Sequence, residues 1–124
     1  MFFFGHEHKK RWKEAVQSAG GVITDGTIKG DFGASLYILT GMPDVYSMVE
    51  KHIHRGYIDF DAMLHMGLSS GETVLVCLAG NLYNGGFFEG YTPADIIEKC
   101  DVESIALAVR AIMIRSQRFN INDL

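Results

Sequence analysis

Apolar residues recur at helical spacing over most of the chain. In residues 6–19 the side chains of Trp12, Val16 and Ala19 fall on one side of a helical wheel, and the lysines fall largely elsewhere. Two glycines follow at positions 20 and 21, where they end the pattern. The first segment is therefore predicted to be an amphipathic helix.

Capping residues mark the starts of most later helices. A polar side chain that accepts a hydrogen bond from a free backbone N–H favours a helix start, and proline suits the first helical position. Ser69 and Glu72 have the spacing of a capping box. The predicted segments are a short helix from Asp31 to about Gly41, a helix from Pro43 to about Arg55, a capped turn from Asp59 to Gly67, a helix at residues 71–83, a short helix after Thr92-Pro93, and a long last helix from Asp101.

One short segment favours strands instead of a helix. Residues 22–28 place β-branched side chains on both sides of Asp25-Gly26, the local pattern of a tight hairpin. With three residues on each side, the hairpin is small.

The helix at residues 71–83 is apolar nearly all round, and we expect it to lie at the centre of the domain. A buried strand gives a similar apolar run, but the capping box and the length of the segment favour a helix. Asn81 lies on an apolar arc of this helix, where an unpaired amide is costly. We therefore expect Asn81 to be buried and hydrogen-bonded to the backbone of a neighbouring loop.

The end of that helix is explained by its small and polar residues. Asn84 or Gly85 can adopt the left-handed conformation that terminates a helix, and Gly86 lets the chain turn away.

The last helix carries two apolar stripes. The larger stripe consists of Val102, Ile105, Ala106, Val109, Ile112 and Met113. A smaller stripe with Leu107 and Ile114 lies elsewhere on the same helix. We expect this helix to contact two different surfaces.

Composition agrees with an ordinary folded domain. The chain has 124 residues, of which 48% are hydrophobic and 21% charged, so neither disorder nor a second independent core is indicated. The sequence predicts a single all-α domain over residues 1–124, with five or six helices around the central apolar helix at residues 71–83 and the small hairpin at residues 22–28.

Charge and terminal patterns limit the partners. Residues 44–103 carry ten acidic and three basic side chains within a chain of formal charge −4, so we do not expect nucleic acid as a partner. No run is long and apolar enough for a membrane span, and the opening Phe residues lack the basic segment of a signal peptide. We expect a cytoplasmic protein whose two cysteines, Cys77 and Cys100, are reduced thiols.

Two His-x-His stretches, His6-Glu7-His8 and His52-Ile53-His54, suggest a metal site with His65 as a further ligand. Two histidines two residues apart on a helix point in different directions, so they do not easily hold one ion. No serine, cysteine or threonine lies in a recognised nucleophile motif. We expect no cofactor and no bound metal, and a metal-dependent hydrolase using His6 and His8 remains an alternative.

Three blocks resemble a family of short bacterial proteins of unknown function. They are residues 36–41, the Leu-Ala-Gly-Asn-Leu-Tyr-Asn-Gly-Gly segment at residues 78–86, and residues 91–96, together with Phe4 and His8-Lys9 near the start. The chain differs from the pattern of that family between Gly41 and Ser69. The resemblance implies a fold and no activity.

The sequence is most typical of a small interaction or regulatory protein, of the accessory kind that bacterial and phage genomes encode. An acidic protein that blocks the nucleic-acid site of a partner is another alternative. The apolar block Phe2-Phe3-Phe4 and the stripe with Leu107 and Ile114 are the candidate contact residues. Two arrangements remain open: a two-fold homodimer formed through one of these surfaces, or packing of the Phe block over the last helix of the same chain.

Overall fold

The computed structural model describes residues 2–86, 88 and 91–124. Helices make up 62% of these described residues, which also form two small antiparallel sheets. Within the described residues the α-helices are α1 (His6–Ser18), α2 (Gly30–Thr40), α3 (Tyr46–Val49), α4 (Phe60–Leu64), α5 (Ser70–Asn84), α6 (Pro93–Lys99) and α7 (Val102–Arg115), and the 3-10 helices are η1 (Glu50–His52) and η2 (Ile121–Asp123). The described residues therefore form seven α-helices, where the sequence pattern predicts five or six.

Most predicted helix caps are confirmed, but α2 begins at Gly30 with Lys29 as its N-cap, so the prediction that Asp31 caps this helix is wrong. The Ser69 hydroxyl accepts a hydrogen bond from the Glu72 N–H at 3.2 Å, and the Glu72 carboxylate accepts one from the Ser69 N–H at 2.8 Å. At the starts of α6 and α7, the side chains of Thr92 and Asp101 accept hydrogen bonds from the N–H groups of Asp95 and Ser104. Because a cap depends only on neighbouring residues, these starts are set by local sequence.

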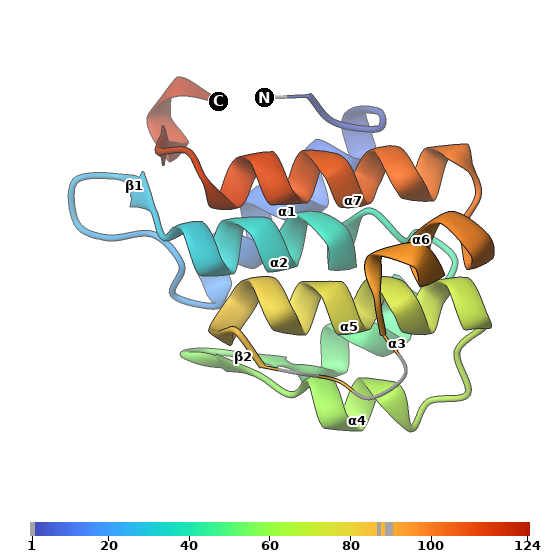
Figure 1. The fold of residues 1–124 in the computed structure, drawn as a ribbon. Helices are drawn as coiled ribbons and strands as arrows, with labels where there is room; N and C mark the ends of the chain where they lie inside the picture. The colour runs from blue at the N-terminus through green and yellow to red at the C-terminus, as the bar shows by residue number, and fades with distance from the viewer. Residues whose placement is uncertain (1, 87, 89–90) are drawn as a thin grey trace.

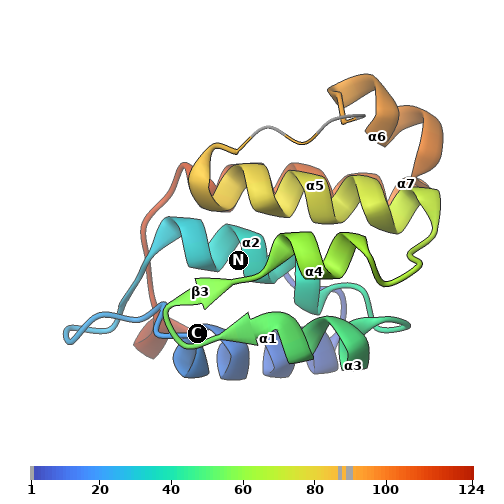
Figure 2. The ribbon, with the colours of Figure 1, turned by 90° about the horizontal axis from the view of Figure 1, so that it is seen from below.

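The central helix is α2, and the prediction that residues 71–83 take this place is wrong. Every residue of α2 from Phe32 to Thr40 is buried. Figure 1 shows α2 between α7 and α5, with α1 behind it, and Figure 2 shows α1 along the other side of α2. The predicted helix is α5, which is buried from Val74 to Gly80 but packs on α2 from one side.

Small residues let the neighbouring helices approach α2 closely. The Trp12 indole N–H of α1 donates a hydrogen bond to the Gly33 carbonyl at 2.9 Å, and the Ser35 hydroxyl donates to the Ala79 carbonyl of α5 at 2.6 Å. At the end of α2, a Cβ added to Gly41 would lie 2.5 Å from a methyl carbon of Leu107. Helices separated by so little space bury their facing side chains almost completely.

The predicted helix from Pro43 to Arg55 is replaced by a shorter helix and a hairpin. α3 ends at Val49 and η1 continues the helical segment to His52. β2 (Ile53–His54) then pairs antiparallel with β3 (Tyr57–Ile58). Gly56 in the turn has a φ of 88°, which glycine adopts readily. The turn at Arg55-Gly56 therefore reverses the chain where the helical pattern predicted only a helix end.

The predicted hairpin at residues 22–28 forms a turn, but its second strand pairs mainly with a segment far along the chain. Val22 and Ile28 form one isolated bridge. β1 (Thr27–Ile28) pairs antiparallel with β4 (Phe119–Asn120) near the other end of the chain. The last residues are thus fastened to the first third of the chain.

Candidate interaction surface on the last helix

The orientation of α7 is opposite to the one that the sequence suggested. Leu107, Ala108, Ala111 and Ile114 are buried, and Leu107 packs against Gly41 at the end of α2. Leu107 and Ile114 are therefore core residues, and the expectation that they lie at a subunit contact is wrong. The physical reason is that Ala108 and Ala111, which are too small to stand out in a hydrophobic pattern, let this face pack closely.

Most of the larger stripe faces outward, whereas Ile105 also packs against the core. We call Val102, Ile105, Ala106, Val109, Ile112 and Met113 the α7 stripe. The side chain of Val102 is 82% exposed, Val109 51%, Ile112 48% and Met113 53%, while Ile105 and Ala106 are half-buried. Single exposed apolar residues are common on proteins, but several on one helix face indicate a contact surface.

The phenylalanine block packs partly over the core of its own chain. The Phe3 ring centroid lies 5.3 Å from that of Trp12 and 5.8 Å from that of Tyr37. Phe3 and Phe4 are half-buried against the core. These two residues therefore pack within their own chain, but Phe3 lies against Trp12 of α1 and Tyr37 of α2, whereas the intramolecular alternative placed the block over the last helix.

Phe2 differs from the other two, because 52% of its surface is exposed. The Arg110 guanidinium of α7 lies 3.8 Å from the centre of the Phe2 ring, within the range of a cation–π contact. Phe2, Met113, Ile114 and Phe119 are among the residues that line a small pocket of about 80 Å³. Phe2 thus extends the α7 stripe on the side of Arg110 and Met113.

A hydrogen bond fixes the start of the chain in this place. The Tyr37 hydroxyl donates to the Phe2 carbonyl at 2.5 Å, and burial raises the pKa of Tyr37 to about 12. His8 is buried beside Tyr37, and its Nδ1 accepts a hydrogen bond from the Phe4 N–H at 3.1 Å. These contacts order a segment that would otherwise be free at a chain end.

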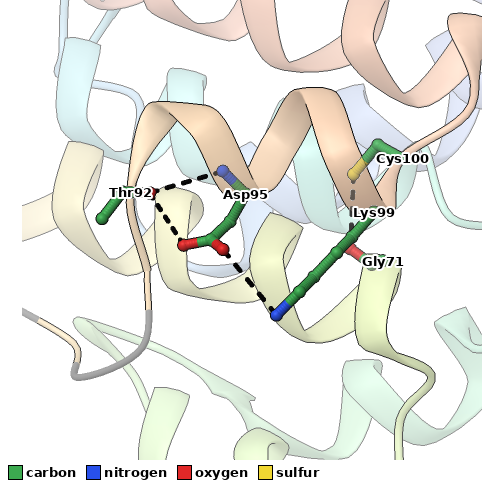
Figure 3. A network of polar contacts seen from close by, with 5 residues as sticks. All are labelled: Gly71, Thr92, Asp95, Lys99 and Cys100. Carbon is green, nitrogen blue, oxygen red and sulfur yellow. Dashed lines mark hydrogen bonds and ion pairs between the residues drawn. The ribbon is translucent and has the colours of Figure 1, made fainter.

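Figure 3 shows polar contacts within α6 and one contact from its end to α5, near the start of α7. The Thr92 hydroxyl donates to the Asp95 carboxylate at 2.9 Å, and Lys99 forms an ion pair with Asp95 at 3.8 Å. The Cys100 thiol lies 3.7 Å from the Gly71 carbonyl at the start of α5. The α6–α7 junction therefore rests on the first turn of α5.

A cleft of about 680 Å³ lies beside this junction and was not foreseen from the sequence. Its walls come from α1, the α2–α3 turn, the start of α5 and the start of α7. Arg11 uses its Nε–H on the Thr40 carbonyl at 2.9 Å, and Glu72 is engaged in the cap of α5. Within the described residues, no buried side-chain nitrogen or oxygen lacks a partner, so the cleft presents no unsatisfied buried group that indicates a ligand.

Neither Cys100 nor His8, which both line the cleft, is activated as a nucleophile or a general base. Burial and the neighbouring Asp101 raise the pKa of Cys100, so its thiol stays protonated near neutral pH. Burial also lowers the pKa of His8, and both of its ring nitrogens are engaged, because Nε2–H donates to the Tyr37 carbonyl at 2.9 Å. A nucleophile with an adjacent base is therefore not formed here.

The histidine arrangement does not favour the metal-dependent hydrolase. His6 is exposed on α1, whereas His8 points into the core with no nitrogen free for a metal. Across the described part of the chain, no group of three or more His, Cys, Asp or Glu side chains is placed to hold a metal ion. Neither cysteine is in a disulfide: Cys77 is buried and Cys100 half-buried.

The Asn81 segment is a helix end rather than a buried polar site. Asn81 is exposed, and the expectation that it is buried is wrong, because Leu82 and Tyr83 turn the other side of the last turn of α5 toward the core. Its amide does donate to a loop backbone group, the Gly86 carbonyl, at 3.0 Å. Gly85 ends the helix with a φ of 73°, and the Asn84 side chain accepts from the Gly86 N–H at 2.8 Å.

Every helix in the described part of the chain is too short or too polar to cross a bilayer. No protein-family model, curated protein or solved structure matches the sequence. The resemblance of residues 78–86 to a bacterial family therefore stays a prediction and brings no activity to this chain.

Proposed function

We propose that this is a small cytoplasmic interaction or regulatory protein that binds another protein chain through the α7 stripe. One observation carries the proposal: Val102, Val109, Ile112 and Met113 expose about half or more of their surfaces on one helix face. Fully burying an exposed side chain of this kind contributes about 1.5–3 kcal/mol, so covering one that is half exposed contributes about half of that. A partner that covers the stripe gains this free energy, which the isolated chain leaves unused.

The distribution of exposed apolar residues supports this choice of surface. Nine large apolar side chains are exposed among the described residues, and four of them lie on α7, with Phe2 close beside them. The others include Ile23 and Met48, which lie in separate parts of the fold. The apolar surface is therefore concentrated on α7.

Photo-crosslinking in cells tests the proposal. A photo-reactive phenylalanine analogue replaces Val109, and the same analogue at Ile23, which is 43% exposed, serves as the control. We expect discrete adducts from position 109 and none from position 23. Adding Ile112→Glu to the first variant should remove the adducts, because a charge on the stripe opposes burial.

Absence of adducts at position 109, or the same adducts at both positions, would contradict the proposal. Circular dichroism of each variant confirms that the fold is retained.

A further inference from the structure

We infer that the partner of the α7 stripe is a second copy of this chain, with the two α7 helices packed antiparallel about a two-fold axis beside residue 107. The inference rests on the proposed function, because it names the occupant of the same surface. The cleft at the α6–α7 junction is not required for it.

The spacing of residues along the stripe fits the contact between two helices of a coiled coil. Val102, Ile105, Val109 and Ile112 follow one another at intervals of three, four and three residues, which is the seam of a coiled coil. If two such helices run antiparallel about residue 107, Val102 of one protomer faces Ile112 of the other. Ile105 then faces Val109. Each apolar residue of the seam therefore meets an apolar residue, and none is left facing a polar one.

The stripe residue nearest the two-fold axis has a small side chain. Ala106 is half-buried on the stripe and lies one position from residue 107. The two copies of Ala106 would approach each other at the axis, where a small side chain permits close helix contact. Met113 lies at the outer end of the same face and can cover the start of the partner helix.

The charged residues next to the stripe are complementary between antiparallel copies. Glu103 and Arg110 lie seven residues apart, and therefore on the same edge of α7, next to the stripe. In the antiparallel arrangement Glu103 of each protomer lies beside Arg110 of the other, which gives two symmetry-related ion pairs. A parallel two-fold arrangement would place this edge of the two helices on opposite sides of the contact, where Glu103 of one protomer does not reach Arg110 of the other. The charges therefore favour one orientation and identify a surface complementary to itself.

The extent of the surface makes Phe2 part of the contact. The seam spans about three helical turns, whereas a stable interface buries about 800 Å² on each partner. Phe2 lies under Arg110 on the edge that carries Glu103, so it extends the contact toward the start of the partner α7. A dimer that includes this ring buries more surface than the two helices alone.

The test measures the mass of the purified full chain by sedimentation equilibrium from low to high micromolar concentration. We expect the mass to rise from 13.8 kDa toward twice that value. Val109→Glu/Ile112→Glu should remain monomeric throughout, while Ile23→Glu/Met48→Glu, at exposed apolar positions elsewhere, should associate like the wild type.

A charge exchange tests the orientation. Glu103→Arg alone and Arg110→Glu alone should each weaken association several-fold, because each places like charges side by side. The double variant Glu103→Arg/Arg110→Glu should recover association, because the pair is restored with its signs reversed. Failure of the double variant to recover, with circular dichroism unchanged, would overturn the antiparallel arrangement.

The outcomes separate this inference from the proposed function. A wild-type chain that stays monomeric at high micromolar concentration would overturn the inference. Adducts from position 109 with another protein would then still support the proposed function, whereas adducts at twice the chain mass support both. Loss of all adducts at position 109 contradicts the proposed function itself.

Discussion

Leu107→Ala should strongly destabilise the folded chain, whereas Ile112→Ala should not. Both substitutions remove three carbon atoms from the same helix, but Leu107 is 3% exposed and Ile112 48%. At about 0.8 kcal/mol for each buried methylene, Leu107→Ala loses about 2.4 kcal/mol of transfer free energy. The cavity left beside Gly41 brings the expected loss to about 3–4 kcal/mol.

For Ile112→Ala the same calculation gives about half the transfer loss, near 1 kcal/mol. The better helix propensity of alanine offsets part of that by about 0.4 kcal/mol. Urea unfolding followed by circular dichroism, at a concentration where the chain is monomeric, gives both values. Equal losses, or a larger loss for Ile112→Ala, would show that the buried and exposed faces of α7 have been assigned the wrong way round.

Three other expectations concern the core and the loops. Gly41→Ala should cost about 1–3 kcal/mol in unfolding free energy, because its Cβ would lie 2.5 Å from Leu107 and 3.0 Å from the Tyr37 carbonyl. Gly30→Ala, whose Cβ would approach the Arg115 carbonyl only to 3.4 Å, is the control and should change it by less than about 0.5 kcal/mol. Burial lowers the pKa of His8, so below about pH 6.5 the unfolded chain takes up a proton that the folded chain does not, and stability should fall as the pH drops. His8→Gln should lose that component of the pH dependence in urea titrations, and an unchanged profile would argue against the buried neutral imidazole. Asn81→Ala should cost about 1 kcal/mol or less, because its bond to Gly86 is exposed, and a loss above about 2 kcal/mol would contradict this.

Local features of the fold could be predicted from the sequence because their causes are local. The Ser69–Glu72 capping box and the start of α6 at Thr92-Pro93 involve residues within one turn of each other. Gly85 ends α5 for the same kind of reason, since it adopts the left-handed conformation without a Cβ clash. These features do not depend on what packs against the helix.

The sequence-based predictions were wrong where the structure of a segment depends on the distant residues that pack against it. β1 pairs with β4, more than ninety residues further along the chain, and no local pattern indicates that pairing. α2 is central because residues such as Gly33 and Ser35 let other helices approach, although they add little hydrophobicity. The uninterrupted apolar run at residues 74–79 led the hydrophobic pattern to select α5 instead.

The candidate site illustrates the same limit. Both faces of α7 are apolar, and more of the large side chains lie on the exposed one. The sequence identified both stripes but not which of them meets the core. Ala108 and Ala111 next to Leu107 were the available signal, because small residues on one face indicate close helix packing.

Methyl NMR with a soluble paramagnetic probe tests the exposed α7 stripe most directly. At low concentration, the methyl groups of Val109, Ile112 and Met113 should relax strongly, while those of Leu107 and Ile114 should be protected. At high micromolar concentration the stripe should become protected, and Ile23 and Met48 should stay accessible. Accessible Leu107 and Ile114 methyl groups, or a stripe protected at every dilution of a monomeric chain, would contradict the exposed stripe.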